Sequence, residues 1–149
     1  MAKATFAAGC FWGIQADFDL LKGVVKTMVG YTGGTMKEPS YEDVLTDTTG
    51  HAESVHVIYN PDIISYKALL ISFFESHNPS TMPGERYKYR STIFYHTKEQ
   101  KEIALSFLKE LKEAKLYELS IKTTVVPATV FYKAEEYHQD YYKKQGMSI

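Results

Sequence analysis

The chain has 149 residues, of which 44% are hydrophobic and 23% charged, a balance typical of one soluble globular domain rather than a disordered or fibrous chain. Its formal net charge of −1 argues against a protein that relies on bulk positive charge to bind nucleic acid or a membrane surface. Its single cysteine excludes a disulfide within the chain and suits a reducing compartment. No apolar run resembles a secretion signal or approaches the roughly 20 residues that span a bilayer. We therefore expect one cytoplasmic domain over residues 1–149.

The first half of the chain alternates apolar strands with helical patterns. Strands are predicted over residues 5–8, 24–31 and 54–59, and helices over residues 11–21 and 66–76. Gly23 is placed to end the first helix, and Ser65 to cap the start of the second. These elements are joined by both short and long connections.

The second half is more helical. Strands are predicted over residues 91–95 and 123–126, and helices over residues 98–114 and 134–143. Thr97 and Gln100 have the spacing of a capping box at the start of the long helix. This order of mixed strands and helices predicts an α+β fold, in which helices cover a mixed sheet.

Cys10 stands where a predicted strand ends and a helix begins, between Gly9 and Gly13. The first N–H groups of a helix carry partial positive charge, which lowers the pKa of a thiol and favours the nucleophilic thiolate. Phe11 and Trp12 can wall an apolar cup beside the sulfur. The alternative is a buried thiol that only packs, as many lone cysteines do.

A carboxylate and two imidazoles follow in Thr49–His56. Alternation along a strand places His51 and Glu53 on one face and His56 on the other. Glu53 is a candidate general acid, because burial keeps a carboxyl protonated near neutral pH; the alternative is an exposed glutamate at a strand edge. A metal site from these three groups is disfavoured, since the histidines point apart. His138 is interpreted as a residue of a helix surface or of the packing.

Two other functions are compatible with parts of the sequence. Strand spacing places Tyr87 and Tyr89 on one face and Arg86, Lys88 and Arg90 on the other, a pattern that also serves stacking and phosphate binding in a nucleic-acid module. Cys10 paired with His51 is the arrangement of a cysteine hydrolase. Neither alternative accounts for a tryptophan beside the cysteine together with a downstream acid.

Six motifs, spread from residue 9 to about residue 142, resemble those of the peptide methionine sulfoxide reductase A family. They are Gly9-Cys10-Phe11-Trp12-Gly13, Gly30-Tyr31-Thr32-Gly33-Gly34, Pro39-Ser40-Tyr41, Gly50-His51-Ala52-Glu53, Tyr89-Arg90-Ser91 and Ala134-Glu135-Glu136-Tyr137-His138-Gln139. The resemblance implies a two-layer α+β sandwich with a split β-α-β (ferredoxin-like) core. It also implies thiol-dependent reduction of the S epimer of methionine sulfoxide, free or in oxidised proteins.

The resemblance also implies roles for individual residues. Cys10 is the nucleophile that attacks the sulfoxide sulfur and becomes a sulfenic acid, and Glu53 is the acid that protonates the sulfoxide oxygen. Tyr41 and Tyr89 hydrogen-bond that oxygen, while Phe11 and Trp12 hold the substrate's methyl group. These roles agree with the chemistry, because an S=O bond is a poor electrophile until its oxygen is protonated.

Two departures from the family pattern affect the mechanism. Many members carry a second cysteine near the C-terminus that attacks the sulfenic acid, whereas some use selenocysteine and carry none; residues 143–149 contain no cysteine. We therefore expect resolution by an external thiol, with glutaredoxin and glutathione, or dithiothreitol in vitro, serving better than thioredoxin alone. The loop before Tyr89 is also short, with Lys88 in place of the family's glutamine, and Glu85 is a candidate to replace its aspartate. No bound cofactor or metal, no nucleic acid, no membrane and a monomeric enzyme are expected.

Overall fold

A computed structural model describes residues 1–9, 11–46, 48–77, 79, 90–115 and 121–144. Its elements are β1 (Ala2–Ala7), α1 (Phe11–Asp19), β2 (Val24–Thr32), α2 (Tyr41–Leu45), β3 (Ala52–Tyr59), α3 (Tyr66–Glu75), β4 (Thr92–Tyr95), α4 (Lys98–Ala114), β5 (Thr124–Pro127), β6 (Tyr132–Lys133), a 3₁₀ turn η2 (Glu136–His138) and α5 (Tyr141–Lys144).

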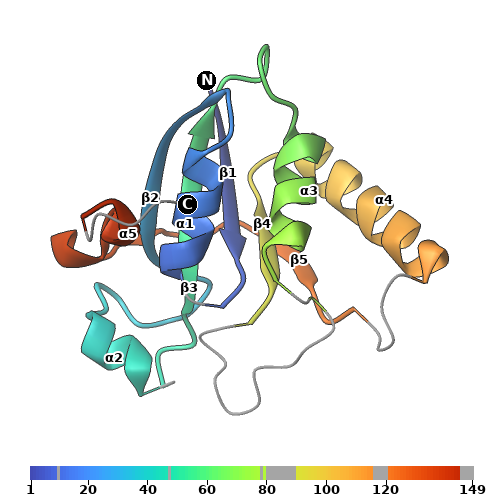
Figure 1. Ribbon diagram of the computed structural model, residues 1–149. Helices are drawn as coiled ribbons and strands as arrows, with labels where there is room; N and C mark the ends of the chain where they lie inside the picture. The colour runs from blue at the N-terminus through green and yellow to red at the C-terminus, as the bar shows by residue number, and fades with distance from the viewer. Residues whose placement is uncertain (10, 47, 78, 80–89, 116–120, 145–149) are drawn as a thin grey trace.

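The strands form one six-stranded sheet in the order β5-β4-β1-β3-β2-β6. Four of the five pairings are antiparallel, and β4 with β5 is parallel. Helices α1 and α3 lie against one face of the sheet, and α4 packs beside α3 (Figure 1). The predicted α+β fold with a mixed sheet covered by helices is therefore confirmed.

The core lies between this sheet face and helices α1 and α3. The fully buried ring of Phe6 on β1 stacks on Phe18 of α1 at 5.2 Å and on Phe73 of α3 at 5.1 Å between ring centroids. Burial of such a side chain stabilises the fold by about 1.5–3 kcal/mol. On β3, the inward alternation continues through Val55 and Val57 to the buried position of Glu53. One polar residue thus shares the core-facing side of the strand.

Most predicted elements are present with shifted ends. β1 begins three residues before the predicted strand, and α1 ends at Asp19 rather than at residue 21. Helix α4 has the predicted bounds, and Thr97 accepts from the Gln100 N–H as expected, but the Gln100 side chain accepts from His96 N–H rather than from Thr97. Only half of the predicted capping box is therefore formed. The five-residue helix α2 was not predicted, although Ser40 and Asp43 cap it reciprocally.

The prediction of one helix over residues 134–143 is wrong. The segment forms the turn η2, an extended Gln139 and then α5. Asp140 has a φ of 53°, which breaks a right-handed helix. The Gln139 side chain meanwhile bonds Val29 and Ala134 of neighbouring segments. Tertiary hydrogen bonds therefore replace the local helical ones.

Among the residues that the structure describes, no helix is long and apolar enough to cross a bilayer.

Candidate active site

The change from strand to helix that the sequence predicted falls after Ala7, where β1 ends, and before Phe11, where α1 begins. Gly9 lies between them with a φ of 76°, a left-handed conformation that favours glycine. Cys10 lies outside the described residues, as does Tyr89. The site is therefore built from the residues that flank Cys10 in the sequence and from the side chains that they contact.

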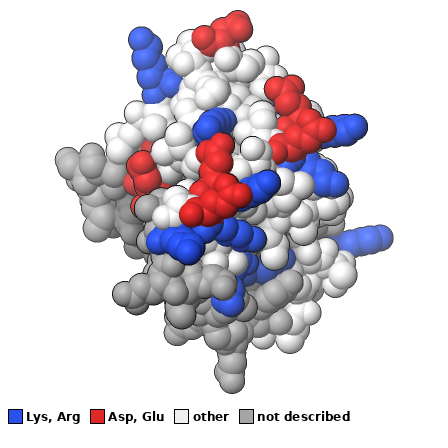
Figure 2. Space-filling model, turned by 90° about the vertical axis from the view of Figure 1, so that its right-hand side faces the viewer, with Lys and Arg blue, Asp and Glu red and all other residues white. Residues whose placement is uncertain are grey.

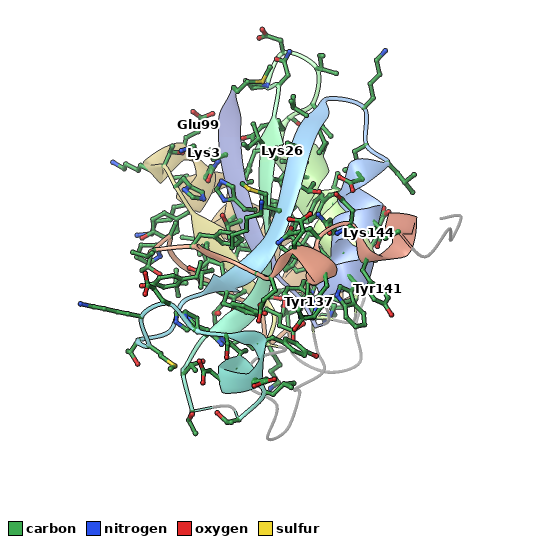
Figure 3. The ribbon with its side chains drawn as sticks, turned by 90° about the vertical axis from the view of Figure 1, so that its left-hand side faces the viewer. Lys3, Lys26, Glu99, Tyr137, Tyr141 and Lys144 are labelled. Carbon is green, nitrogen blue, oxygen red and sulfur yellow. The ribbon has the colours of Figure 1, made fainter. Side chains whose placement is uncertain are left out.

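Phe11 and Trp12, in the first turn of α1, belong to one group of rings. Phe11 is buried, with its ring centroid 5.2 Å from that of His138, and the Trp12 indole stacks on Tyr141 of α5 at 3.8 Å. Tyr41, the first residue of α2, places its ring 4.3 Å from His138. We call these five residues the aromatic cluster. It joins α1, α2 and the C-terminal segment, which crosses α1 (Figure 3).

His138 lies at the centre of the aromatic cluster and is 1% exposed. Its Nδ1 accepts a hydrogen bond from the Trp12 indole N–H at 3.1 Å, so the imidazole is neutral with its proton on Nε2. Burial lowers the pKa of His138, although the charge of Glu135 opposes this effect. No described residue accepts from Nε2, which leaves one donor for a ligand. Of the two interpretations made from sequence, packing is correct and a helix surface is not.

Glu53 is 1% exposed, which excludes the interpretation as an exposed strand-edge residue. It lies opposite Tyr31 in the pairing of β2 with β3. Burial raises the pKa of Tyr31, and its hydrogen bond to Glu135 and the charges of Glu135 and Glu53 raise it further. The Tyr31 ring is also 5.9 Å from that of Phe11. Tyr31 therefore joins the buried acid to the aromatic cluster.

Glu135 accepts two hydrogen bonds at this junction. Its Oε1 accepts from the hydroxyl of Tyr31 and its Oε2 from the backbone N–H of Tyr41, both at 2.9 Å. Burial acts to raise the pKa of Glu135, but these hydrogen bonds hold it below its ordinary value. Glu135 was not a candidate on sequence grounds. The signal was its place in the motif Ala134–Gln139, which contributed only to the family resemblance.

The two histidines near Glu53 have other partners. His51 accepts from Gly34 N–H at Nδ1 and donates to the Met36 carbonyl from Nε2. Both ring nitrogens are therefore engaged, which counts against the hydrolase alternative, because a general base needs a free nitrogen. His56 lies on the opposite sheet face and bonds Thr5 at 2.9 Å. No group of three metal-binding side chains occurs within the described ranges.

Of the five residues Arg86 to Arg90, Arg90 alone is described. Its guanidinium donates to the Gly50 carbonyl at 3.0 Å, so it supports the loop before β3. On the molecular face that carries α4, acidic and basic side chains lie side by side, with several Lys and Arg side chains together below its centre (Figure 2). Residues 86–89, on which the nucleic-acid alternative mainly depends, lie outside the described residues.

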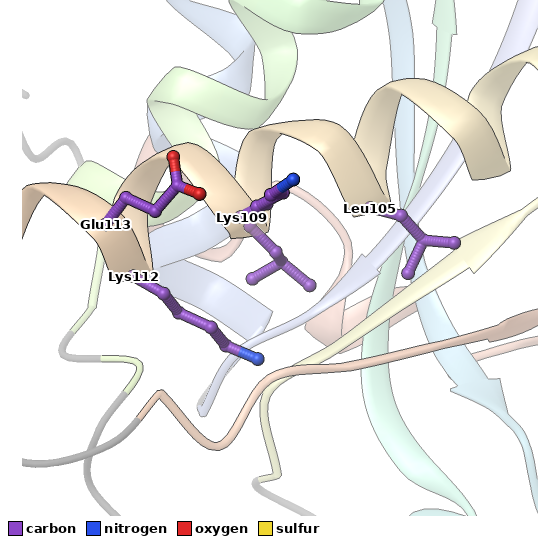
Figure 4. A pocket seen from close by; sticks show the side chains of 5 residues that line it. Leu105, Lys109, Lys112 and Glu113 are labelled. Atoms are coloured by element: carbon purple, nitrogen blue, oxygen red, sulfur yellow. The ribbon is translucent and has the colours of Figure 1, made fainter.

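A hollow of about 370 Å³ lies on α4, lined by Leu105, Leu108, Lys109, Lys112 and Glu113 (Figure 4). Helix α4 packs near β4 and β5 at one edge of the sheet. Helix α5 and the aromatic cluster lie towards the other edge, near β2 (Figure 1). Three of its five lining residues are flexible charged side chains on the surface of one helix. We therefore assign it no part in the chemistry.

A family model described as peptide methionine sulfoxide reductase matches residues 2–148. The chain belongs to this family. It is 51% identical over 150 residues to peptide methionine sulfoxide reductase MsrA of Methanosarcina mazei, covering 98% of this chain and 71% of the relative. The reduced form of Mxr1 from Saccharomyces cerevisiae has a similar structure, with a TM-score of 0.87 and 31% identity over 99% of this chain and 87% of that one.

A further crystal structure holds Mxr1 in complex with Trx2, at a TM-score of 0.66 and 28% identity over 94% of this chain and 84% of that one. The predicted oxidoreductase is thereby confirmed: the protein is a peptide methionine sulfoxide reductase of the A type. The aromatic cluster and Glu53 can now be considered as its active site.

Proposed function

We propose that this reductase works through Cys10 as nucleophile and Glu53 as general acid. One observation carries the proposal. Phe11 and Trp12, which follow Cys10 in the sequence, lie in an aromatic cluster that Tyr31 joins to the buried carboxyl of Glu53. A buried acid close to aromatic walls suits a substrate with an apolar methyl group at one end and an oxygen to be protonated at the other.

The reduction of one sulfoxide consumes one thiolate and one proton. The Cys10 thiolate forms a bond to the sulfoxide sulfur while Glu53 gives its proton to the oxygen. The protonated oxygen then passes from the substrate sulfur to the sulfur of Cys10. In this step the S–O bond of the substrate and the new S–S bond break and a Cys10 S–O bond forms, so methionine leaves and Cys10 is a sulfenic acid. Methionine sulfur is reduced by two electrons, and the cysteine is oxidised by two.

Further side chains assist at the two ends of the substrate. Tyr41 and Tyr89 donate to the developing negative charge on the oxygen, which lowers the barrier more than it stabilises the bound substrate. Phe11 and Trp12 hold the methyl group. Because the methyl group and the oxygen are each bound at a fixed place around the sulfur, the site selects the S epimer. The substrate is methionine sulfoxide, either free or in an oxidised protein.

An external thiol regenerates the enzyme, because Cys10 is the one cysteine of this chain. The first thiol displaces water from the sulfenic acid and forms a mixed disulfide, and a second thiol then releases Cys10. Glutathione with glutaredoxin performs both steps. The complex of yeast Mxr1 with Trx2 supports thioredoxin as a partner in the family, but thioredoxin normally acts on a protein disulfide. Dithiothreitol replaces either system in vitro.

The fold proposal follows from strand order. Strands β4-β1-β3-β2 are adjacent and antiparallel, with α1 between β1 and β2 and α3 between β3 and β4. That order supports a split β-α-β core in a two-layer sandwich. We further propose that residues 1–149 form a single catalytic domain.

The test uses the two methionine sulfoxide epimers separately, with dithiothreitol as reductant. We expect turnover of the S epimer, its loss in Cys10→Ser, and a strongly reduced kcat in Glu53→Gln. Thr124→Ser, on the distant strand β5, is a matched control and should retain the wild-type rate. Activity that persists in Cys10→Ser would rule out the mechanism.

A further inference from the structure

We infer that Glu135 is a positioning residue of this reductase, which acts by fixing Tyr41 and Tyr31 through its two carboxylate oxygens. The inference rests on the proposed function, because it assigns Tyr41 to the sulfoxide oxygen. It adds a residue that contacts neither the substrate nor Cys10 in the proposed mechanism.

The first step concerns Tyr41, whose backbone N–H lies at the start of α2. The first N–H groups of a helix have no partner within that helix. Ser40 and Asp43 cap α2 reciprocally, Ser40 N–H donating to Asp43 and Asp43 N–H to Ser40. Tyr41 N–H instead donates to Oε2 of Glu135, 94 residues away in the sequence. The carboxylate therefore holds the first residue of a helix whose start Ser40 and Asp43 define, and with it the origin of the Tyr41 side chain.

The second step concerns Tyr31, which lies opposite Glu53 on the neighbouring strand. Its fully buried hydroxyl donates to the other oxygen of Glu135. The Tyr31 ring also contacts Phe11, which together with Trp12 forms the proposed pocket for the substrate's methyl group, here called the methyl pocket. The hydrogen bond to Glu135 therefore fixes a ring that lies between Glu53 and the methyl pocket. One carboxylate thus holds Tyr41, which is proposed to bind the sulfoxide oxygen, at a fixed position relative to Tyr31, which contacts the methyl pocket.

The third step is why a carboxylate is needed. Its two oxygens accept from two donors at once, and hydrogen bonds to an ionised acceptor are shorter and stronger than neutral ones. A glutamine has only one acceptor oxygen, and its NH₂ group would face the second donor. The conservative variant therefore retains one of the two hydrogen bonds at most.

The next residue provides a matched control. The carboxyl of Glu136 is exposed and lies 3.4 Å from Lys144 on the solvent side. It has the same charge as Glu135, which immediately precedes η2, but it reaches neither tyrosine in the described contacts. Replacing it tests the loss of a carboxylate from η2 without the loss of positioning.

The experiment measures kcat and KM of the full-length protein with methionine S-sulfoxide and dithiothreitol. We expect kcat/KM to fall by up to about 100-fold in Glu135→Ala, to fall less in Glu135→Gln, and to stay unchanged in Glu136→Ala. The loss should lie in kcat, because the methyl pocket still binds the substrate. Hydrogen exchange at the Tyr41 amide, measured by NMR, should be faster in Glu135→Ala than in wild type.

A double-mutant cycle separates positioning from a general loss of stability. If Glu135 acts through the Tyr41 phenol, Glu135→Ala should cost much less activity in a Tyr41→Phe background than in wild type. Equal losses in both backgrounds, or wild-type kcat in Glu135→Ala, would overturn the inference. If Glu135→Ala does not fold, Glu135→Gln carries the same cycle. Inactivity of the wild-type enzyme would instead refute the proposed function.

Discussion

The indole N–H of Trp12 donates to Nδ1 of His138 at 3.1 Å across 126 residues of sequence. The bond ties the first turn of α1, directly after Cys10 in the sequence, to the turn η2 near the C-terminus. Because Tyr141 stacks on the same indole within 9° of parallel, the C-terminal segment fixes both the plane and the direction of this ring. The methyl pocket proposed for the reductase is therefore held together by the two ends of the chain.

Trp12→Phe should weaken both the fold and the enzyme. Phenylalanine keeps an apolar ring but leaves the buried Nδ1 of His138 without its donor, which costs about 1–3 kcal/mol of unfolding free energy. Chemical denaturation measures this loss, and steady-state kinetics should show a lower kcat/KM for methionine sulfoxide. Tyr137→Phe, at a residue that is 59% exposed, is the control. An unchanged denaturation midpoint in Trp12→Phe would contradict the role given to the indole N–H.

Gln139→Ala should destabilise the protein more than replacement of an exposed neighbour. The Gln139 amide accepts from Val29 N–H and donates to the carbonyls of Val29 and Ala134, each at 2.9 Å. Alanine leaves the Val29 N–H and the Ala134 carbonyl without these side-chain partners, while the Val29 carbonyl keeps its hydrogen bond from the Ala134 N–H. We therefore expect a loss on the order of 3 kcal/mol in urea denaturation. Lys144→Ala, on the exposed side of the same segment, should change the unfolding free energy by about 0.5 kcal/mol or less. Similar midpoints for the two variants would contradict this role.

Acid should destabilise the fold through His56. Burial lowers the pKa of His56 to about 4, and the charges of His96 and Lys3 add to this effect. Between pH 6.5 and 4 the unfolded chain therefore binds more protons than the folded one. The stabilising contribution is complete above pH 6.5 and is lost as the pH falls towards 4. His77, whose pKa burial also lowers, acts with the same sign.

The check is the unfolding free energy of wild type and His56→Gln, measured by urea titration at several pH values between 7.5 and 4. The slope against pH should be smaller in the variant, since glutamine does not titrate. A slope that is identical in the two proteins would show that His56 is not responsible.

A single turnover without reductant should yield one methionine per chain and leave a trappable sulfenic acid. The reason is that a chain with one cysteine has no second thiol to form an internal disulfide. Quantifying the methionine formed, and the mass of the enzyme after reaction with a sulfenic-acid trap such as dimedone, measures both. Release of two methionines per chain, or a failure of dimedone to react, would disagree with an external resolving thiol.

The sequence indicated much of the fold because local signals were strong. Ser65 caps α3 and Thr97 caps α4 as predicted, since each hydroxyl bonds an N–H three residues ahead and needs no distant partner. The burial of Glu53 also agreed with its candidacy as an acid, because strand alternation puts it on the side of Val55 and Val57. In these cases the physical cause lies within a few residues of the signal.

The C-terminal segment shows where sequence was insufficient. A polar, Tyr-rich run predicted one helix over residues 134–143, whereas Gln139 turns its side chain to Val29 and Asp140 breaks the helix with a positive φ. The partners lie on β2, more than a hundred residues earlier. A helical pattern cannot report hydrogen bonds that form only after the sheet has assembled.

The sequence by itself determined the family and the single thiol, and it supplied Cys10 and Glu53 as the proposed nucleophile and acid, because a cysteine next to paired aromatic rings and a downstream Gly-His-Ala-Glu motif are local features of the chain. Only the tertiary structure decided that Glu135 bonds Tyr31 and Tyr41, and that His138 orients Trp12. The physical reason is that hydrogen bonds and ring contacts depend on distances of a few ångströms. Packing of β2, α1 and α2 against the C-terminal segment creates those distances, and no spacing along the chain specifies them.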